Sequence, residues 1–169
     1  MALARAVEFI PSGARLFVGN SLAVRNLDRF GAPGSKALEV FGNRGASGID
    51  GNISTALGVA AADRSRPLVA MVGDITLYHD LNGLLALRSQ GLDNVTILLF
   101  NNHGGGIFHQ LPVARFEPPF RELFLTPHDL QFEHAARLYG MDYYLAPDAL
   151  LLHSALEGSF TDRTPRLIE

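Results

Sequence analysis

The sequence predicts an α/β fold, a doubly wound and mainly parallel sheet with helices on both faces. Three observations support this prediction. Short apolar runs alternate with helical patterns along the chain. The run VTILLF at 95–100 is continuously apolar, which is typical of a strand buried on both faces of a parallel sheet. The chain has 169 residues, 47% of them hydrophobic, and we therefore expect residues 1–169 to form a single domain.

Each expected element has its own signal in the sequence. Apolar runs predict the strands, and capping residues followed by apolar residues at helical spacing predict the helices. Strands are expected at 16–19, 38–41, 68–72, 95–100, 142–145 and from 167 to the end of the chain. The first expected helix runs from a cap at Ser21 to about Phe30, with Leu22, Val24, Leu27 and Phe30 toward the core. A second is expected at 53–64, and a third runs from a cap at Asp80 to Gln90. The last two are expected at 131–139, where Gly140 ends the helix, and at 147–157.

One segment departs from the alternating pattern. Residues 101–129 are proline-bearing and show little periodicity. A connection of this length inside a domain is usually functional or mobile. We therefore expect a loop that is functional or mobile there.

Composition excludes several classes of function. The net charge is −3, and the basic residues are scattered, with Lys36 the only lysine, so no nucleic-acid partner is expected. There is no cysteine, which rules out disulfides and thiolate metal sites. No apolar run approaches the length of a membrane span, and no signal-peptide pattern opens the chain. A cytoplasmic domain without a membrane span is the expectation.

Unusual polar residues follow three of the expected strands. Ligands of doubly wound sheets bind outside the carboxyl ends of the strands. Asp74, Asn102 and a carbonyl from the glycine turn at 42–52 are oxygen ligands of the kind that magnesium prefers, and the glycines allow backbone amides to approach a diphosphate. A turn or capping role is the alternative reading for each of the two side chains.

The spacing of these residues resembles a known fingerprint. Gly73-Asp74 and, about 25 residues later, Asn101-Asn102 resemble the Gly-Asp-Gly and Asn-Asn pair of thiamine-diphosphate enzymes, with Ile75 in place of the third glycine. The segments FVGNSLAVR, FGNRGASGIDG, GDITLYHDLNGL and NNHGGGIFHQLP occur in this order. Together they resemble the C-terminal domain of the 2-succinyl-5-enolpyruvyl-6-hydroxy-3-cyclohexene-1-carboxylate synthase family of menaquinone biosynthesis, from about residue 13 to residue 168.

The resemblance implies a reaction and a cofactor. Members of that family are transferases that decarboxylate 2-oxoglutarate and add the succinyl unit to isochorismate, with thiamine diphosphate and Mg²⁺ or Mn²⁺. By resemblance, Asp74, the side chain of Asn102 and the carbonyl of Gly104 hold the metal. The cofactor-binding residues that the resemblance implies are Gly73, Ile75 and Thr76 against the diphosphate, Ile49 as an apolar wedge beneath the bent cofactor, and Ser47, Ile107 and Phe108.

The resemblance also implies substrate-binding residues. Arg25 and Arg44 match arginines that face substrate carboxylates, and guanidinium groups suit such bidentate contacts. Asn20 and Ser21 match residues near the succinyl group. A solvated side chain is the alternative for each arginine, and a core or anchoring role is the alternative for the apolar residues. No catalytic histidine is assigned, and His128, His134 and His153 are expected to be surface or packing residues.

One catalytic group of the superfamily has no match in this sequence. The glutamate that activates the cofactor belongs to a pyrimidine-binding domain, usually of a neighbouring subunit, and neither that domain nor the central domain resembles any segment here. We therefore expect no catalytic residue in this chain, no activity of the isolated chain, and a homo-oligomer, dimer or tetramer. The alternatives are another thiamine-diphosphate decarboxylase or carboligase acting on a 2-oxoacid, a non-catalytic phosphate-binding module, and a fragment that only dimerises.

Overall fold

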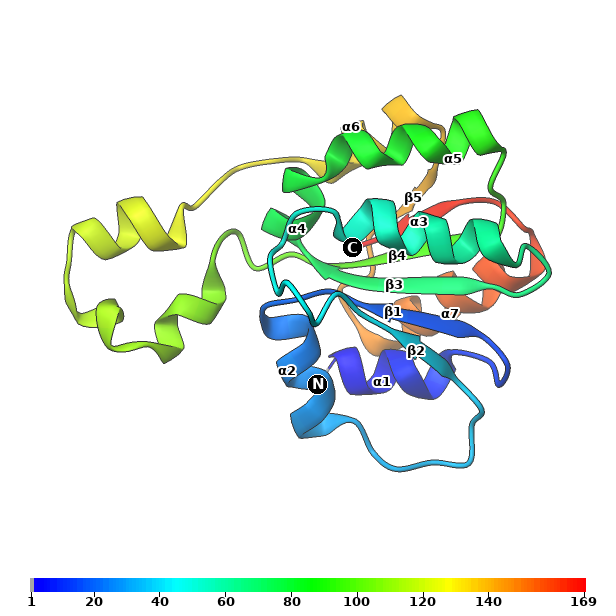
Figure 1. Ribbon diagram of the computed structural model, residues 1–169, viewed down its shortest axis with the longest axis horizontal. Helices are drawn as coiled ribbons and strands as arrows, with labels where there is room; N and C mark the ends of the chain where they lie inside the picture. Colours follow the sequence, from blue (N-terminus) through cyan, green and yellow to red (C-terminus); the bar gives the residue numbers. More distant parts are fainter. Residues whose placement is uncertain (1) are drawn as a thin grey trace.

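The strands form one parallel sheet in the order β2-β1-β3-β4-β6-β5 (Figure 1). The structure is a computed structural model, and it describes residues 2–169. Every pair of neighbouring strands runs parallel, and β3 and β4 share the longest register, from Leu68 beside Val95 to Gly73 beside Phe100. This confirms the predicted fold class. The strands are β1 (Arg15–Val18), β2 (Glu39–Phe41), β3 (Leu68–Gly73), β4 (Val95–Phe100), β5 (Asp142–Tyr144) and β6 (Arg166–Ile168).

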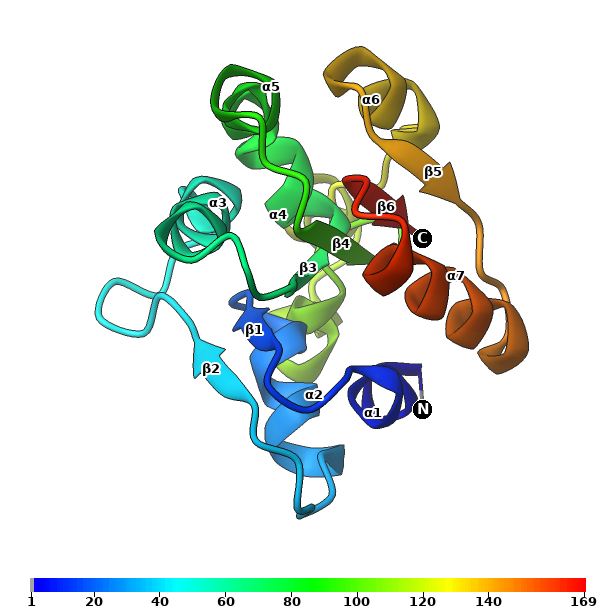
Figure 2. The ribbon, with the colours of Figure 1, turned by 90° about the vertical axis from the view of Figure 1, so that its right-hand side faces the viewer.

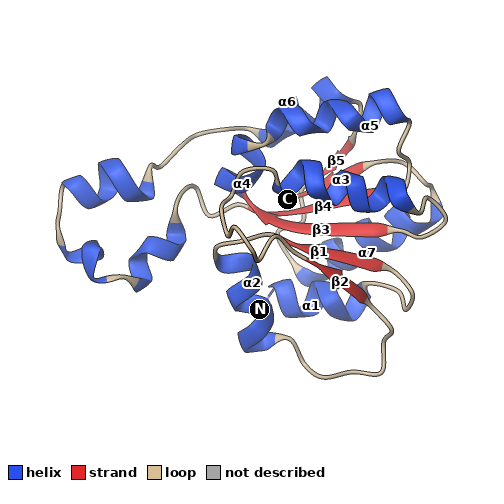
Figure 3. Cartoon of the chain, viewed as in Figure 1, coloured by secondary structure: helices blue, strands red, loops and turns tan. Residues whose placement is uncertain are grey.

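Helices cover both faces of the sheet (Figures 1 and 2). One face carries α3 (Asn52–Ala62), α4 (Asp74–His79), α5 (Leu85–Gln90) and α6 (Phe132–Tyr139), and the other carries α1 (Ala2–Phe9), α2 (Leu22–Phe30) and α7 (Ala149–Thr161). Figure 3 shows the sheet between these two helical layers. None of the helices described between residues 2 and 169 has the length and apolar character needed to cross a membrane.

The core is divided by the alternation of side chains along the central strands. In β3, Leu68, Ala70 and Val72 face the layer of α3 to α6, whereas Val69 and Met71 face the layer of α1, α2 and α7. All five side chains are fully buried. Because successive residues of a strand point to opposite faces, a continuous apolar run is needed when both faces are covered.

Helix α1 is absent from the prediction. Its buried residues are Leu3 and Ala6, and Ile10 follows immediately after the helix. These positions are three or four residues apart, which is the spacing of one helical face. The helix packs against α2 and α7 and completes the second layer.

The predicted helix from Asp80 to Gln90 is wrong in its start. The chain forms α4 up to His79, then a 3₁₀ turn, η1 (Leu81–Leu84), and then α5. The carboxylate of Asp80 makes no cap for its own helix. It accepts hydrogen bonds from the backbone N of Ser54 at 2.7 Å and from the Ser54 hydroxyl at 3.0 Å. Asp80 therefore caps the first turn of α3 from a neighbouring element.

Two expectations for α2 are also wrong. Ser21 occupies the N-cap position but makes no capping hydrogen bond with its side chain, and its φ is 67°. Phe30, expected in the core, is 42% exposed, and Ala23 is the buried residue of this helix. Val24 and Leu27, two of the other expected core residues, are partly buried and pack against the core.

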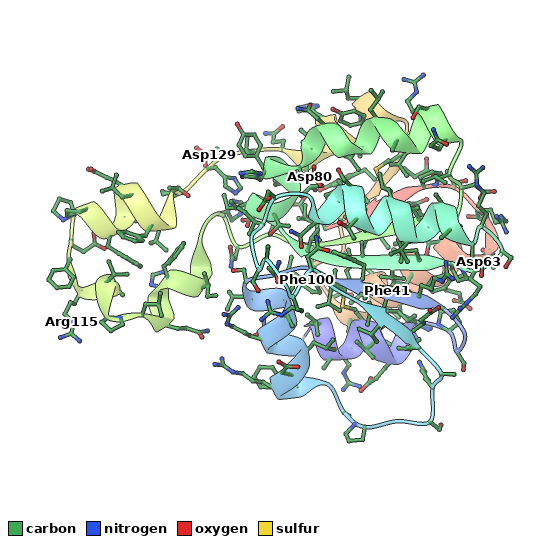
Figure 4. All side chains as sticks on the ribbon, viewed as in Figure 1. Phe41, Asp63, Asp80, Phe100, Arg115 and Asp129 are labelled. Carbon is green, nitrogen blue, oxygen red and sulfur yellow. The ribbon has the colours of Figure 1, made fainter. Side chains whose placement is uncertain are left out.

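Residues 103–130, which we call the arm, project beyond the carboxyl ends of the strands (Figure 1). The arm contains the short helical turns η2 (Gly106–Gln110), η3 (Pro112–Arg115) and η4 (Arg121–Leu125). Figure 4 places Arg115 at its far end and Asp129 where it returns to the body. Phe120 is buried in a small aromatic cluster within the arm, with Phe124 stacked 6.3 Å away between ring centroids.

A network of polar side chains links the ends of β4, β5 and β6. Asn101 follows β4, and its Nδ2 donates to Glu169 Oε1 at 2.6 Å. The hydroxyl of Tyr143 in β5 donates to Glu169 Oε2 at 2.9 Å. Burial, the hydrogen bond to Glu169 and the negative charge of Glu169 together raise the pKa of Tyr143 from 10.0 to about 12.

The capping role of Asp80 predicts a loss of stability on its removal. We expect Asp80→Ala to lower the free energy of unfolding by about 1 kcal/mol, because the first turn of α3 loses its acceptor. Chemical denaturation measures the change, with Asp28→Ala, an exposed position on α2, as the matched control. Equal stability of the Asp80→Ala variant and the Asp28→Ala control would contradict this role.

The Tyr143 network predicts a late-titrating phenol. Because the pKa of Tyr143 is raised in the folded state, the stability it contributes is present below pH 10 and is lost as the pH rises toward 12. Absorbance titration should resolve one of the four tyrosines near pH 12 and lose that component in Tyr143→Phe. Glu169→Gln should move the component toward pH 10, and an unchanged titration in this variant would contradict the assignment.

Candidate functional site

A cavity of about 690 Å³ lies at the carboxyl ends of β1, β3 and β4. In a doubly wound sheet this edge is where ligands bind. Every residue predicted for the metal, cofactor or substrates lines this cavity except Arg44. These residues are Asn20, Ser21, Arg25, Ser47, Ile49, Gly73, Asp74, Ile75, Thr76, Asn102, Gly104, Ile107 and Phe108.

The carboxylate of Asp74 is buried and surrounded by donors. Its side chain follows β3 directly and is 3% exposed. The oxygen Oδ1 accepts the backbone N–H of Ile75 at 2.8 Å. The oxygen Oδ2 accepts the backbone N–H groups of Asn102 at 3.2 Å and of Gly104 at 2.9 Å, so that the ends of β3 and β4 meet at this group.

A fourth donor to Asp74 comes from the arm. The Nε2 of His128 lies 3.1 Å from Asp74 Oδ2, and the His128 side chain is 12% exposed. The expectation that His128 is a surface or packing residue misses this hydrogen bond. The spacing between Asp74 and His128 in the sequence matches no known motif, and the two residues meet only because the arm folds back.

The glycines after Asn102 allow the chain to pass the returning arm. Gly104 has a φ of 145°, and a Cβ there would overlap the carbonyl oxygen of Leu125. The backbone N–H of Gly105 donates to the same oxygen at 2.7 Å. A Cβ on Gly106 would overlap the amide nitrogen of Asn102, which shows that this side chain lies against the glycine backbone. Backbone carbonyls therefore leave no room for a side chain at Gly104, whereas a side chain at Gly106 would require the Asn102 amide to move.

Asn20 holds the glycine turn beside the cavity. Its side chain is almost fully buried, and its Nδ2 donates to the carbonyls of Asn43 at 3.1 Å and of Gly48 at 2.6 Å. The buried Asn52, which sequence reasoning missed, donates to the same Gly48 carbonyl at 3.1 Å. The two asparagines thus fix a turn that has little regular structure of its own.

The two predicted arginines differ in position. Arg25 lines the cavity, is exposed, and donates from Nη1 to the carbonyl of Ser21 at 2.8 Å. Arg44 lies outside the cavity lining and donates from Nη1 to Asn20 Oδ1 at 2.6 Å. Arg25 is therefore the arginine with direct access to a ligand.

The cavity lining also includes residues that the sequence did not predict, among them Glu169 and Leu3. Glu169 follows β6 and Leu3 lies on α1, and both border the cavity. No local pattern in the sequence points to either residue. Leu3 lies on a helix that was not predicted, and Glu169 reaches the cavity only because β6 lies next to β4 in the sheet. The lining is mixed, with Ile49, Ile107 and Phe108 among its apolar side chains.

The side chains and carbonyls near Asp74 that could act as metal ligands restrict which metals the cavity can hold. Within residues 2–169 there is no group of three or more His, Cys, Asp or Glu side chains that could hold a metal ion. A metal at Asp74 would therefore rely on neutral oxygens such as the Asn102 amide and the Gly104 carbonyl. An all-oxygen set of this kind suits Mg²⁺ or Mn²⁺ rather than zinc.

Comparisons with known proteins agree with this geometry. Residues 28–169 match the thiamine pyrophosphate enzyme, C-terminal TPP binding domain family. The chain is 57% identical over 164 residues to a 2-succinyl-5-enolpyruvyl-6-hydroxy-3-cyclohexene-1-carboxylate synthase of Roseiflexus sp. (strain RS-1), covering 97% of this chain and 28% of that protein. It is 52% identical over 158 residues to the synthase of that name from Chloroflexus aurantiacus, covering 94% of this chain and 27% of that protein.

Solved structures share the fold. Benzoylformate decarboxylase from Polynucleobacter necessarius superposes with a TM-score of 0.77 at 19% identity, over 99% of this chain and 31% of that chain. A thiamine diphosphate-dependent 4-hydroxybenzoylformate decarboxylase from Rhodococcus jostii RHA1 gives a TM-score of 0.75 at 19% identity, with the same coverage. The chain thus belongs to the thiamine pyrophosphate enzymes as their C-terminal TPP binding domain, and it corresponds to that domain of the 2-succinyl-5-enolpyruvyl-6-hydroxy-3-cyclohexene-1-carboxylate synthases.

Proposed function

We propose that this domain binds the diphosphate of thiamine diphosphate through a Mg²⁺ or Mn²⁺ ion held by Asp74, the Asn102 side chain and the Gly104 carbonyl. The observation that carries the proposal is the buried Asp74 carboxylate at the cavity wall, with the backbone of Asn102 and Gly104 hydrogen-bonded to it. A buried carboxylate is costly unless hydrogen bonds or a cation compensate its charge. A metal would supply that compensating charge.

The free lone pairs at this point support the proposal. Asp74 Oδ1 accepts one hydrogen bond, from Ile75, which leaves an acceptor position. The Gly104 carbonyl accepts the N–H of Gly106 at 2.9 Å and retains its second lone pair. Magnesium prefers about six oxygen ligands, and phosphate oxygens and water would complete the shell.

The residues beside the metal site would hold the rest of the cofactor. Gly73, Ile75 and Thr76, where β3 passes into α4, would contact the diphosphate, and Ile49 and Ile107 would contact the ring system. Ser47 and Phe108 complete the proposed cofactor contacts. When bound, thiamine diphosphate supplies the carbon nucleophile and the electron sink for decarboxylation of a 2-oxoacid.

For the whole protein we propose the decarboxylation of 2-oxoglutarate and transfer of the succinyl unit to isochorismate. This rests on the names of relatives of which the chain spans about 28% of the length. Arg25 would bind a substrate carboxylate directly. Arg44 would act through Asn20, which with Ser21 borders the cavity, because the hydrogen bond between Arg44 and Asn20 joins the turn to the lining.

The isolated domain is proposed to be inactive. Among residues 2–169, the only glutamate that lines the cavity is Glu169, and both of its carboxylate oxygens accept hydrogen bonds, from Asn101 and Tyr143. The activating glutamate would come from a pyrimidine-binding domain, which with a central domain lies outside this chain. A homo-oligomer in the cytoplasm is part of the same proposal.

Substitution of Asp74 tests the metal site. Thiamine diphosphate titrated into the protein in the presence of Mg²⁺ should show binding by calorimetry, and EDTA should abolish that binding. We expect Asp74→Ala and Asp74→Asn each to weaken this binding because the charged ligand is lost. The loss of affinity should exceed the roughly 10–100-fold that is typical when a residue that only supports a metal ligand is replaced. Asp28→Asn is the matched control. Metal-dependent binding that survives in both Asp74 variants would refute the site.

Substitution of Arg25 tests the substrate assignment. In the complete product of the gene, Arg25→Ala should raise the KM of a carboxylate substrate by about 10–100-fold, the value of a charge-assisted hydrogen bond. The affinity for thiamine diphosphate should stay unchanged. Arg25→Lys should restore the KM only in part, because a lysine cannot form the bidentate contact. With the exposed Arg5→Ala as control, an unchanged KM in Arg25→Ala would assign the substrate carboxylates to other residues.

A further inference from the structure

We propose that His128 is a positioning residue for the metal site, one that fixes the orientation of the Asp74 carboxylate and couples the arm to metal binding. The inference rests on the proposed function, in which Asp74 is a metal ligand. Nothing in the motifs of the sequence assigns this role to His128. It follows from the hydrogen bonds that converge on one oxygen.

The two oxygens of Asp74 are used unequally. Oδ2 lies within 3.2 Å of three nitrogen atoms, those of Asn102, Gly104 and His128, whereas Oδ1 accepts only the N–H of Ile75. A carboxylate oxygen offers about two lone-pair positions, so three donors saturate Oδ2. The remaining acceptor position is on Oδ1. A metal would therefore bind at Oδ1, and the hydrogen bonds to Oδ2 would fix the orientation of the carboxylate.

His128 reaches the carboxylate from outside the cavity. Asp74, Asn102 and Gly104 line the cavity, whereas His128 does not. Its bond to Oδ2 therefore leaves the cavity side of the carboxylate open. A residue in this place orients a ligand without competing for the ligand's free lone pair.

The His128 ring is itself fixed by its neighbours. Its Nδ1 accepts the backbone N–H of Leu130 at 3.3 Å, which leaves Nε2 to carry the proton donated to Asp74. The buried Phe132, at the start of α6, meets the ring edge-on with 6.0 Å between centroids. The donor is thus held in place by one backbone hydrogen bond and by contact with the ring of a core phenylalanine.

Both ends of the arm meet at the same atom. The arm leaves the sheet beside Asn102 and Gly104 and returns at His128, and all three donate to Asp74 Oδ2. Outside these contacts, the N–H of Gly105 pairs with the carbonyl of Leu125 across the base of the arm. A metal that fixes Asp74 therefore also fixes the base of the arm, and loosening that base disorders the ligand.

Titration of Mn²⁺ in the presence of thiamine diphosphate tests the proposal, with free Mn²⁺ measured by electron paramagnetic resonance in the complete gene product. His128→Leu fills similar space without a donor and should weaken Mn²⁺ binding about 10–100-fold. His128→Gln carries an amide donor near the position of Nε2 and should restore most of that loss. His128→Asn, whose shorter side chain falls short of Oδ2, should resemble His128→Leu and serves if the leucine variant does not fold.

Hydrogen exchange supplies a readout that packing alone would not change. In the unsubstituted protein, Mn²⁺ should slow amide exchange at 125–130 where the arm returns. In His128→Leu the same saturating Mn²⁺ should leave exchange there unchanged. His134→Leu, an exposed position on α6, is the matched control and should behave as the unsubstituted protein.

The outcomes separate this inference from the proposed function. Unchanged Mn²⁺ affinity in His128→Leu, with binding abolished in Asp74→Ala, would overturn the role of His128 and leave the metal site standing. Equal weakening in His128→Leu and His128→Gln would show that the ring acts by packing, which also overturns it. Absence of any Mn²⁺ binding that depends on Asp74 would overturn the proposed function, and this inference with it.

Discussion

The carboxylate of Asp74 is the group on which the arrangement of the cavity depends. It is a charge in a buried position, and such a charge is stable only where several donors surround it. Those donors come from the start of α4, from the end of β4 and from the returning arm. One side chain thereby joins segments up to 54 residues apart along the sequence, and the wall of the cavity is built around it.

The rest of the site is assembled in the same manner, by polar side chains that hold backbone lacking regular structure. Asn20 and Asn52 bind the carbonyl of Gly48 and so keep the glycine turn at the end of β1. The parallel sheet places these groups close together, because the carboxyl ends of β1, β3 and β4 lie at one edge of the sheet. A rigid sheet with irregular connections allows close approach of a diphosphate without moving the core.

The sequence predicted what depends on local pattern. The apolar run at 95–100 has the bounds of β4 as predicted, and the Gly-Asp and Asn-Asn spacing placed Asp74 and Asn102 on neighbouring strand ends. What it missed depends on tertiary contacts. Asp80 caps α3 instead of its own helix, and His128 reaches Asp74 only because the arm folds back. Arg44 lies outside the cavity lining, and its guanidinium donates a hydrogen bond to Asn20. No spacing rule encodes such contacts.

The most direct test of the account is a crystal structure of the complete gene product with thiamine diphosphate and Mn²⁺, the metal located by its anomalous signal. We expect a metal about 2 Å from Asp74 Oδ1, the Asn102 side-chain oxygen and the Gly104 carbonyl oxygen, with His128 still hydrogen-bonded to Oδ2. A metal on Oδ2 with His128 displaced would contradict the division of the two oxygens. A metal away from Asp74 would contradict the site as a whole.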